Sequence, residues 1–127
     1  MKKLLTLLFS ILISFNSYGE WSEVSIGVSS GNTTYLDNDT IREKDGYVYF
    51  WSLQDRVKPN DYGDMSIKTY WQGDCDLKKM RSLTNIFFPQ PMGEGIPETD
   101  YPPREWQYQS PGSVGEGFLD YACDYVK

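Results

Sequence analysis

Residues 47–53 read YVYFWSL and form the clearest predicted β-strand in the chain. Successive side chains of a strand point to opposite faces of a sheet. One face of this strand would carry Tyr47, Tyr49, Trp51 and Leu53, and the other Val48, Phe50 and Ser52. An aromatic row on a sheet is usually core, but it forms a binding face if a helix covers the opposite side. Because both faces are apolar, the sequence leaves open which of them is covered.

Further strands are predicted on both sides of residues 47–53, where alternating apolar residues are separated by turn residues. Asp45-Gly46, just before the central strand, is a strong hairpin signal. In the strand over residues 79–88 we expect Met80, Ile86 and Phe88 to share one face. The other predicted strands cover residues 21–28, 33–36 and 66–75, with a single capped turn at 37–40.

A helix is predicted near the end of the chain. Ser113 and Glu116 have the spacing of a capping box, in which the serine hydroxyl binds the third helical N–H. Val114, Phe118 and Ala122 follow at four-residue intervals and form an apolar stripe. The predicted fold is therefore α+β, a single domain with an antiparallel sheet of about five to six strands and this helix packed on it.

Residues 89–105 differ in composition from the rest of the chain, since they contain five of its seven prolines. We expect a long connection without regular structure. Two interpretations remain open for it: a packed surface crossover or a binding loop.

The N-terminus has the features of a secretory signal peptide. Lys2 and Lys3 precede an apolar run over residues 4–15, and small residues occupy positions 17 and 19. We predict cleavage between Gly19 and Glu20, which gives a signal peptide over 1–19 and a mature domain over 20–127. The alternative, a membrane anchor, is disfavoured because about 12 residues span only ~18 Å as a helix. No later stretch of the sequence is apolar for long enough to span a membrane.

Cys75 and Cys123 are the two cysteines of the chain. In an exported protein an even cysteine count predicts a disulfide, because the compartments outside the cytoplasm are oxidising. A Cys75–Cys123 bridge would connect the end of a predicted strand to the predicted helix.

Charge and composition exclude several functions. Removal of Lys2 and Lys3 lowers the 12 basic side chains to 10, which with 18 acidic ones gives a net charge of −8. Such a surface repels phosphate, so nucleic acid is not an expected partner. The absence of histidine excludes serine and cysteine triads that use it. The acidic residues follow neither a glycosidase motif nor the spacing of a calcium loop, so we predict no enzyme activity, no cofactor and no metal.

Two groups of residues are candidates for binding. Lys78, Lys79 and Arg81 form a small basic cluster that suits an anionic partner, although such a cluster is more often a solvated strand end. The second group is aromatic and consists of Tyr47, Tyr49, Trp51 and Trp106.

The chain resembles the surface-adhesin protein E family of Gram-negative bacteria. The residues that carry the resemblance are Trp21, Tyr35-Leu36-Asp37, Thr40-Ile41-Arg42, Trp51-Ser52-Leu53, Ser66-Ile67-Lys68, Asp74-Cys75, Met80-Arg81-Ser82, Trp106, Pro111-Gly112-Ser113 and Cys123. Each piece is short, and their order and spacing over residues 21–123 make the match specific.

The resemblance implies an exported binding protein whose partners are host extracellular-matrix or plasma proteins such as laminin and vitronectin. It also leaves self-association as a homodimer open. No cysteine lies near the predicted cleavage site, so we expect a periplasmic or secreted protein more than a lipid-anchored one at the cell surface. The alternative function is a periplasmic inhibitor or assembly factor that binds an enzyme such as lysozyme, because an acidic domain suits a basic partner.

Overall fold

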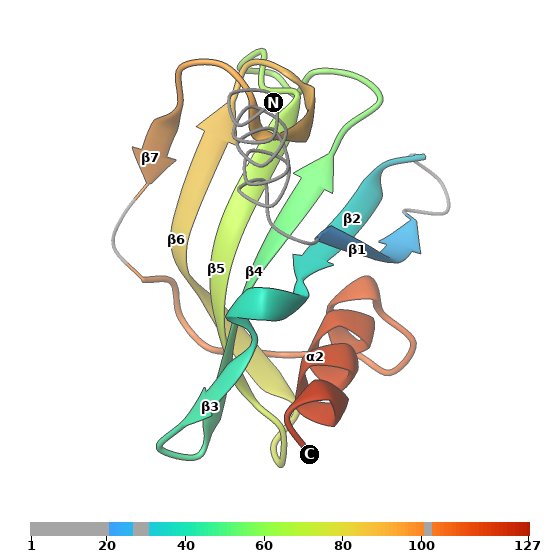
Figure 1. Cartoon of the computed structure of the whole chain (residues 1–127), viewed down its shortest axis with the longest axis vertical. Coiled ribbons are helices and arrows are strands. Elements are labelled where there is room, and N and C mark those ends of the chain that lie inside the picture. The colour runs from blue at the N-terminus through green and yellow to red at the C-terminus, as the bar shows by residue number, and fades with distance from the viewer. Residues whose placement is uncertain (1–20, 27–30, 101–102) are drawn as a thin grey trace, which may run out of the picture.

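The computed structural model describes residues 21–26, 31–100 and 103–127. Val28 of the first predicted strand, the predicted signal peptide and its cleavage site lie outside these ranges. The described residues form an antiparallel sheet with one C-terminal α-helix and two single-turn 3-10 helices (Figure 1). The elements are β1 (Trp21–Ile26), β2 (Thr33–Asp37), η1 (Asn38–Thr40), β3 (Arg42–Lys44), β4 (Tyr47–Asp55), β5 (Ser66–Asp74), β6 (Lys79–Phe88), η2 (Pro91–Gly93), β7 (Glu98–Asp100), β8 (Gln107–Tyr108) and α2 (Val114–Tyr125).

The main strand order of the sheet is β1-β2-β4-β5-β6-β7. The two remaining strands lie outside this order: β3 pairs with β4, and β8 pairs with β6. The predicted antiparallel sheet with a C-terminal helix is therefore confirmed. The turn between β3 and β4 has positive φ at both Asp45 (54°) and Gly46 (85°), which is the geometry that an Asp-Gly hairpin favours.

The core lies between the sheet and α2. Val48 and Phe50 of β4 are buried together with Phe118, Leu119 and Ala122 of the helix. The helix covers the lower half of this face of the sheet (Figure 1). The face of β4 that bears Val48 and Phe50 is thus the covered one, and the aromatic row lies on the opposite face. This settles the question that the sequence left open.

A bulge in β6 changes the direction of its side chains. Tyr70 pairs with Thr84 but the next residue of β5, Trp71, pairs with Ser82, so that Leu83 is an extra residue. Met80 therefore faces α2 and joins the core, whereas Ile86 faces the other side of the sheet, opposite Lys68. The prediction that Met80, Ile86 and Phe88 share a face is wrong, because an extra residue shifts the two-residue alternation.

Residues 89–105 are more regular than predicted. They contain η2 and β7, and β7 pairs with β6 through Asn85, Ile86 and Phe87. Ser66 fixes the start of the segment, since its Oγ donates to the carbonyl of Gln90 (2.6 Å) and accepts from the N–H of Gly93 (2.8 Å). The prediction of a segment without regular structure is wrong here because the edge of β6 offers unpaired backbone groups that β7 satisfies.

A disulfide and two hydrogen bonds at the N-terminus stabilise α2. A disulfide joins Cys75, after β5, to Cys123 in the helix, as predicted. Ser113 caps the helix by accepting a hydrogen bond from the N–H of Glu116 (3.1 Å). The Glu116 carboxylate reaches back one residue further than in a capping box and accepts from the N–H of Gly112 (3.0 Å). In the described ranges no helix is both long and apolar enough to cross a bilayer.

Candidate functional site

The face of the sheet opposite α2 carries a group of half-buried aromatic rings, which we call the aromatic face. Tyr49 and Trp51 project from β4, and Tyr70 projects from β5 between them. The Tyr70 ring centroid lies 6.1 Å from that of Tyr49 and 5.0 Å from that of Trp51. These rings come from neighbouring strands in register, so their spacing is set by the sheet itself.

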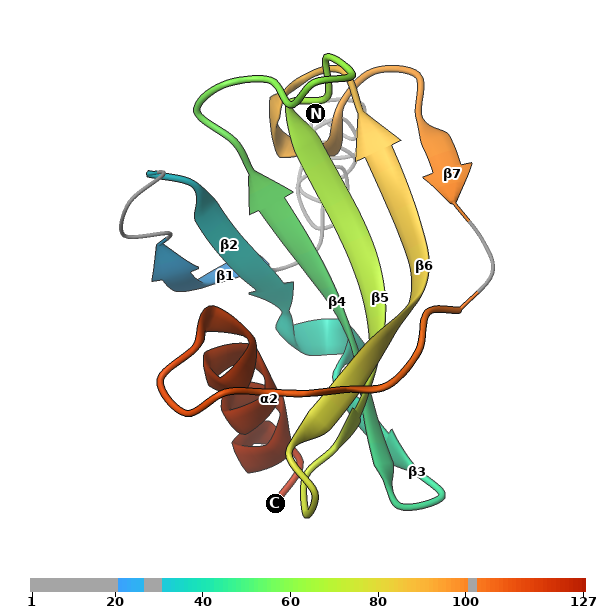
Figure 2. The ribbon, with the colours of Figure 1, turned by 180° about the vertical axis from the view of Figure 1, so that it is seen from behind.

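Trp106 joins the aromatic face from a distant part of the sequence. It lies in the segment 103–112, here called the strap, which runs past the lower end of β6 toward α2 (Figure 2). Pairing of β8 with Lys79 and Met80 of β6 anchors the strap. The Trp106 ring lies 5.4 Å from the Tyr47 ring, and the side chains of Lys79 and Arg81 lie 5.0 and 4.9 Å from its centroid. Cations at such distances from an indole are electrostatically stabilised.

Two further cations reach this face through β3. Arg42 pairs with Tyr49 and Lys44 pairs with Tyr47, and paired residues of antiparallel strands point to the same face. A hollow of about 290 Å³ is lined by Arg42 and Lys44 of β3, Asp45 of the turn, Tyr49 of β4 and Tyr70 of β5. Sequence reasoning missed both cations, although the Asp-Gly hairpin signal would have placed them opposite the aromatic row.

A short chain of hydrogen bonds orders the centre of the face. Arg81 Nε donates to Gln72 Oε1 (2.8 Å), and Gln72 Nε2 donates to the hydroxyl oxygen of Tyr49 (3.0 Å). Gln72 is 7% exposed. Side chains that are fixed in this way lose little conformational entropy when a ligand binds.

Lys78 does not belong to this site. Its ammonium group pairs with the carboxylate of Asp120 on α2, and that hydrogen bond raises the pKa of Lys78. The predicted cluster of Lys78, Lys79 and Arg81 is therefore split: the last two lie on the aromatic face, and the first contacts the helix.

A comparison with protein-family models identifies residues 21–124 as matching surface-adhesin protein E. The chain belongs to the surface-adhesin protein E family. The match spans every strand described above and all but the last residue of α2, in agreement with the resemblance seen in the sequence. Among curated proteins, none matches the chain significantly.

Solved structures of Haemophilus influenzae protein E have the same fold as this adhesin-family chain. A selenomethionine form is 15% identical, with a TM-score of 0.62 over 82% of this chain and 85% of that one. A second structure is 12% identical, with a TM-score of 0.60 over 82% and 83%. Crystal form II is 15% identical, with a TM-score of 0.59 over 72% and 80%. At these identities the comparison establishes the fold alone.

The upper end of the aromatic face in this adhesin-family chain combines tryptophan rings with one acidic and one basic side chain. A hollow of about 320 Å³ there is lined by Trp21, Asp37, Trp51, Lys68 and two other residues. Lys68 Nζ lies 5.7 Å from the Trp21 ring centroid and 5.3 Å from that of Phe88. Burial raises the pKa of Asp37, while the hydrogen bond from the N–H of Asp39 and the charge of Lys68 oppose that rise.

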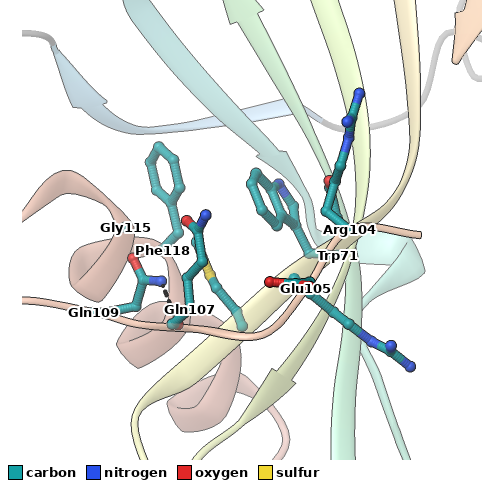
Figure 3. A pocket seen from close by; sticks show the side chains of 10 residues that line it. Trp71, Arg104, Glu105, Gln107, Gln109, Gly115 and Phe118 are labelled. Atoms are coloured by element: carbon teal, nitrogen blue, oxygen red, sulfur yellow. Dashed lines mark hydrogen bonds between the residues drawn. The ribbon is translucent and has the colours of Figure 1, made fainter. Parts of the chain in front are cut away.

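The chain has another hollow, on the side of the helix. It measures about 290 Å³ and lies between the strap, β6 and the start of α2 (Figure 3). Trp71 and Phe118 supply apolar walls, while Gln107 and Gln109 of the strap lie along its rim. Of the residues predicted for binding, Arg81 alone is among those lining this hollow. In the described part of the chain no cluster of three or more acidic, cysteine or histidine side chains is arranged to hold a metal.

Proposed function

We propose that this protein is an exported, non-enzymatic binding protein that recognises a macromolecular partner through the aromatic face. The observation that carries the proposal is the contact of Trp106 with Tyr47, Lys79 and Arg81, on the side of the sheet where Trp51 stacks on Tyr70. Large rings with adjacent cations are the residues that dominate the free energy of binding at protein interfaces. Membership of the adhesin family supports the same function.

The partners that fit this proposal are host extracellular-matrix or plasma proteins such as laminin and vitronectin. Export follows from the predicted signal peptide over residues 1–19, and it places the protein in the periplasm, at the cell surface or outside the cell. The lack of histidine and of a carboxylate motif supports a role in binding and not in catalysis.

Inhibition of a basic enzyme such as lysozyme is the alternative, and the net charge of the chain favours it. The aromatic face disfavours it, because a basic enzyme would be repelled by the cations that surround Trp106. An inhibitor of this kind would have to bind the enzyme through an acidic surface elsewhere on the molecule.

The test is a titration of the purified, oxidised protein on immobilised laminin, vitronectin and lysozyme at physiological salt. Trp106→Ala should weaken binding to the matrix protein by roughly tenfold or more, since a central aromatic contact contributes about 2 kcal/mol. Tyr62→Ala is the matched control, because Tyr62 is 90% exposed in the loop between β4 and β5 and should leave the affinity unchanged.

Matrix-protein binding that Trp106→Ala leaves intact would argue against the aromatic face. Saturable binding to lysozyme alone would favour the inhibitor. Circular dichroism of both variants shows whether the fold is retained.

A further inference from the structure

The lower end of the aromatic face concentrates positive charge on an acidic protein. Four cations gather there: Arg42, Lys44, Lys79 and Arg81. The chain as a whole has a net charge of −6. In the described ranges the ion pairs join Lys78 to Asp120, Arg104 to Asp100 and Lys127 to Asp124, so none of them neutralises these four cations. We call these four cations, together with the rings of Tyr47, Tyr49 and Trp106, the basic end.

The carboxylates near the basic end include those of Asp45, Asp74 and Glu105, and Glu105 lines a hollow together with Arg81. Asp45 lines the hollow beside Arg42 and Lys44. Asp74 pairs with Lys79 in the sheet, but its Oδ1 accepts hydrogen bonds from the N–H groups of Asp76 and Leu77. The four cations outnumber these three carboxylates, so we expect positive charge to prevail at the basic end.

The register of the strands places these cations on two sides of an uncharged centre. Arg42, Tyr49, Gln72 and Arg81 lie opposite one another across β3, β4, β5 and β6. With neighbouring strands about 4.8 Å apart, this row spans roughly 14 Å. Lys44 lies two residues from Arg42 on β3, which displaces it by about 7 Å along the strand. The enclosed area suits an elongated ligand with charges that repeat along its length.

We infer that the basic end binds a linear sulfated glycan. Guanidinium and ammonium groups at the borders would pair with the anionic groups. The Tyr49 hydroxyl, whose oxygen accepts from Gln72, would donate its own hydrogen to a sugar hydroxyl, and the half-buried rings of Tyr47 and Trp106 would present their remaining apolar surface to the C–H groups of the sugar. This inference rests on the proposed function in so far as it uses the same face.

The geometry favours a glycan over an extended acidic peptide. Peptides that bind sheets add a strand at an edge, where backbone groups are free. At the centre of the basic end, β4 and β5 are paired on both sides, so a ligand that lies across this face contacts side chains there. A glycan chain is recognised through such contacts.

Single-stranded nucleic acid fits less well. It binds by stacking its bases on free aromatic faces. Here the Trp106 ring already contacts Tyr47, Lys79 and Arg81, and the Tyr70 ring lies between those of Tyr49 and Trp51. These contacts cover part of each ring, so less free aromatic face remains on which a base could stack.

The experiment measures binding of a size-defined heparin oligosaccharide to the oxidised protein at several salt concentrations. The control ligands are the same oligosaccharide without its sulfates and a single-stranded oligothymidylate. The double variant Arg42→Glu/Lys44→Glu alters exposed side chains and should weaken heparin binding by about tenfold or more. Lys58→Glu/Lys127→Glu is the matched control, because it changes the net charge equally at exposed positions outside the basic end.

Heparin binding that weakens with salt and is lost only in the Arg42/Lys44 variant supports the inference. Equal binding of the desulfated ligand or of the oligothymidylate overturns it, as does an equal loss in both double variants. Laminin and vitronectin are tested in parallel with the same proteins. If they bind and heparin does not, this inference fails while the proposed function stands; if neither class binds, both fail.

Discussion

Leu119 of α2 packs directly on the backbone of Gly73 in β5. A Cβ atom added at Gly73 would lie 2.4 Å from Leu119 Cδ1 and 3.0 Å from Val48 Cγ1. Leu119 is completely buried, so its side chain cannot move aside into solvent. The missing side chain at Gly73 thus sets how closely the helix approaches the sheet.

Gly73→Ala should lower the free energy of unfolding by about 1–3 kcal/mol, because the extra methyl group overpacks the core. Gly117→Ala provides the control, since a Cβ at that exposed helical position meets nothing within 4 Å. The control should stabilise the protein by about 0.5–1 kcal/mol through the better helix propensity of alanine. Urea denaturation of the two variants measures both values. Equal stability of the two would contradict the close approach of Leu119 to Gly73.

Loss of the disulfide should be costly. Cys75 and Cys123 are 48 residues apart, and in the chain-entropy model a bridge over such a loop contributes about 4 kcal/mol. We expect Cys75→Ala/Cys123→Ala to lower the free energy of unfolding by about that amount, as measured by urea denaturation. The reduced wild-type protein should behave like the double variant. A loss below about 1 kcal/mol would show that the helix docks without the bridge.

The N-cap of α2 provides a local test. Ser113→Ala removes the hydroxyl that accepts the hydrogen bond from the N–H of Glu116, and should cost about 1 kcal/mol of stability. Ser110→Ala lies three residues earlier on an exposed part of the strap and should have a much smaller effect. Thermal denaturation followed by circular dichroism compares the two. A destabilisation at Ser110 that equals the one at Ser113 would rule out the capping role.

The raised pKa of Asp37 predicts that the stability of the protein depends on pH. Burial raises its pKa above the ordinary value of 3.8, so the folded protein binds this proton more readily than the unfolded chain. The contribution of this group to stability is therefore fully present below the ordinary pKa and is lost as the pH rises through the folded pKa. Asp37→Asn keeps an oxygen that can accept the hydrogen bond from the N–H of Asp39 and removes the charge.

We accordingly expect Asp37→Asn to be at least as stable as the wild type at neutral pH. The decline in stability as the pH rises from below 3.8 toward neutral should also be smaller in the variant. Urea denaturation across that range measures the difference. The control is Asp61→Asn, which alters an exposed residue in the loop after β4. A variant that is less stable than the wild type at neutral pH and unchanged in acid would reverse the predicted sign.

Local signals in the sequence were sufficient for the individual elements. The alternation in residues 47–53 identified β4, the Asp45-Gly46 pair identified its hairpin turn, and the Ser113–Glu116 spacing identified the start of α2. These signals work because they depend on side chains within a few residues of one another. Two cysteines in a chain with a predicted signal peptide were likewise enough to predict the bridge that the structure contains.

The short edge strands escaped prediction for the opposite reason. The three-residue strand β7 and the two-residue strand β8 form only because β6 presents unpaired backbone groups at its edge. Nothing within residues 98–100 or 107–108 signals a strand. The same holds for the bulge at Leu83, which is visible only in the pairing of β6 with β5.

The sequence by itself determined the fold class, the capped helix and the paired cysteines, because each depends on composition or on short-range spacing. Only the tertiary structure decided which face of β4 is covered, since both faces are apolar and the choice depends on where α2 docks. It also decided that Arg42, Lys79 and Trp106 share one surface. Arg42 and Trp106 are 64 residues apart in the sequence, and strand pairing and the path of the strap bring them to the same surface. Long-range pairing of this kind leaves no local pattern in the sequence.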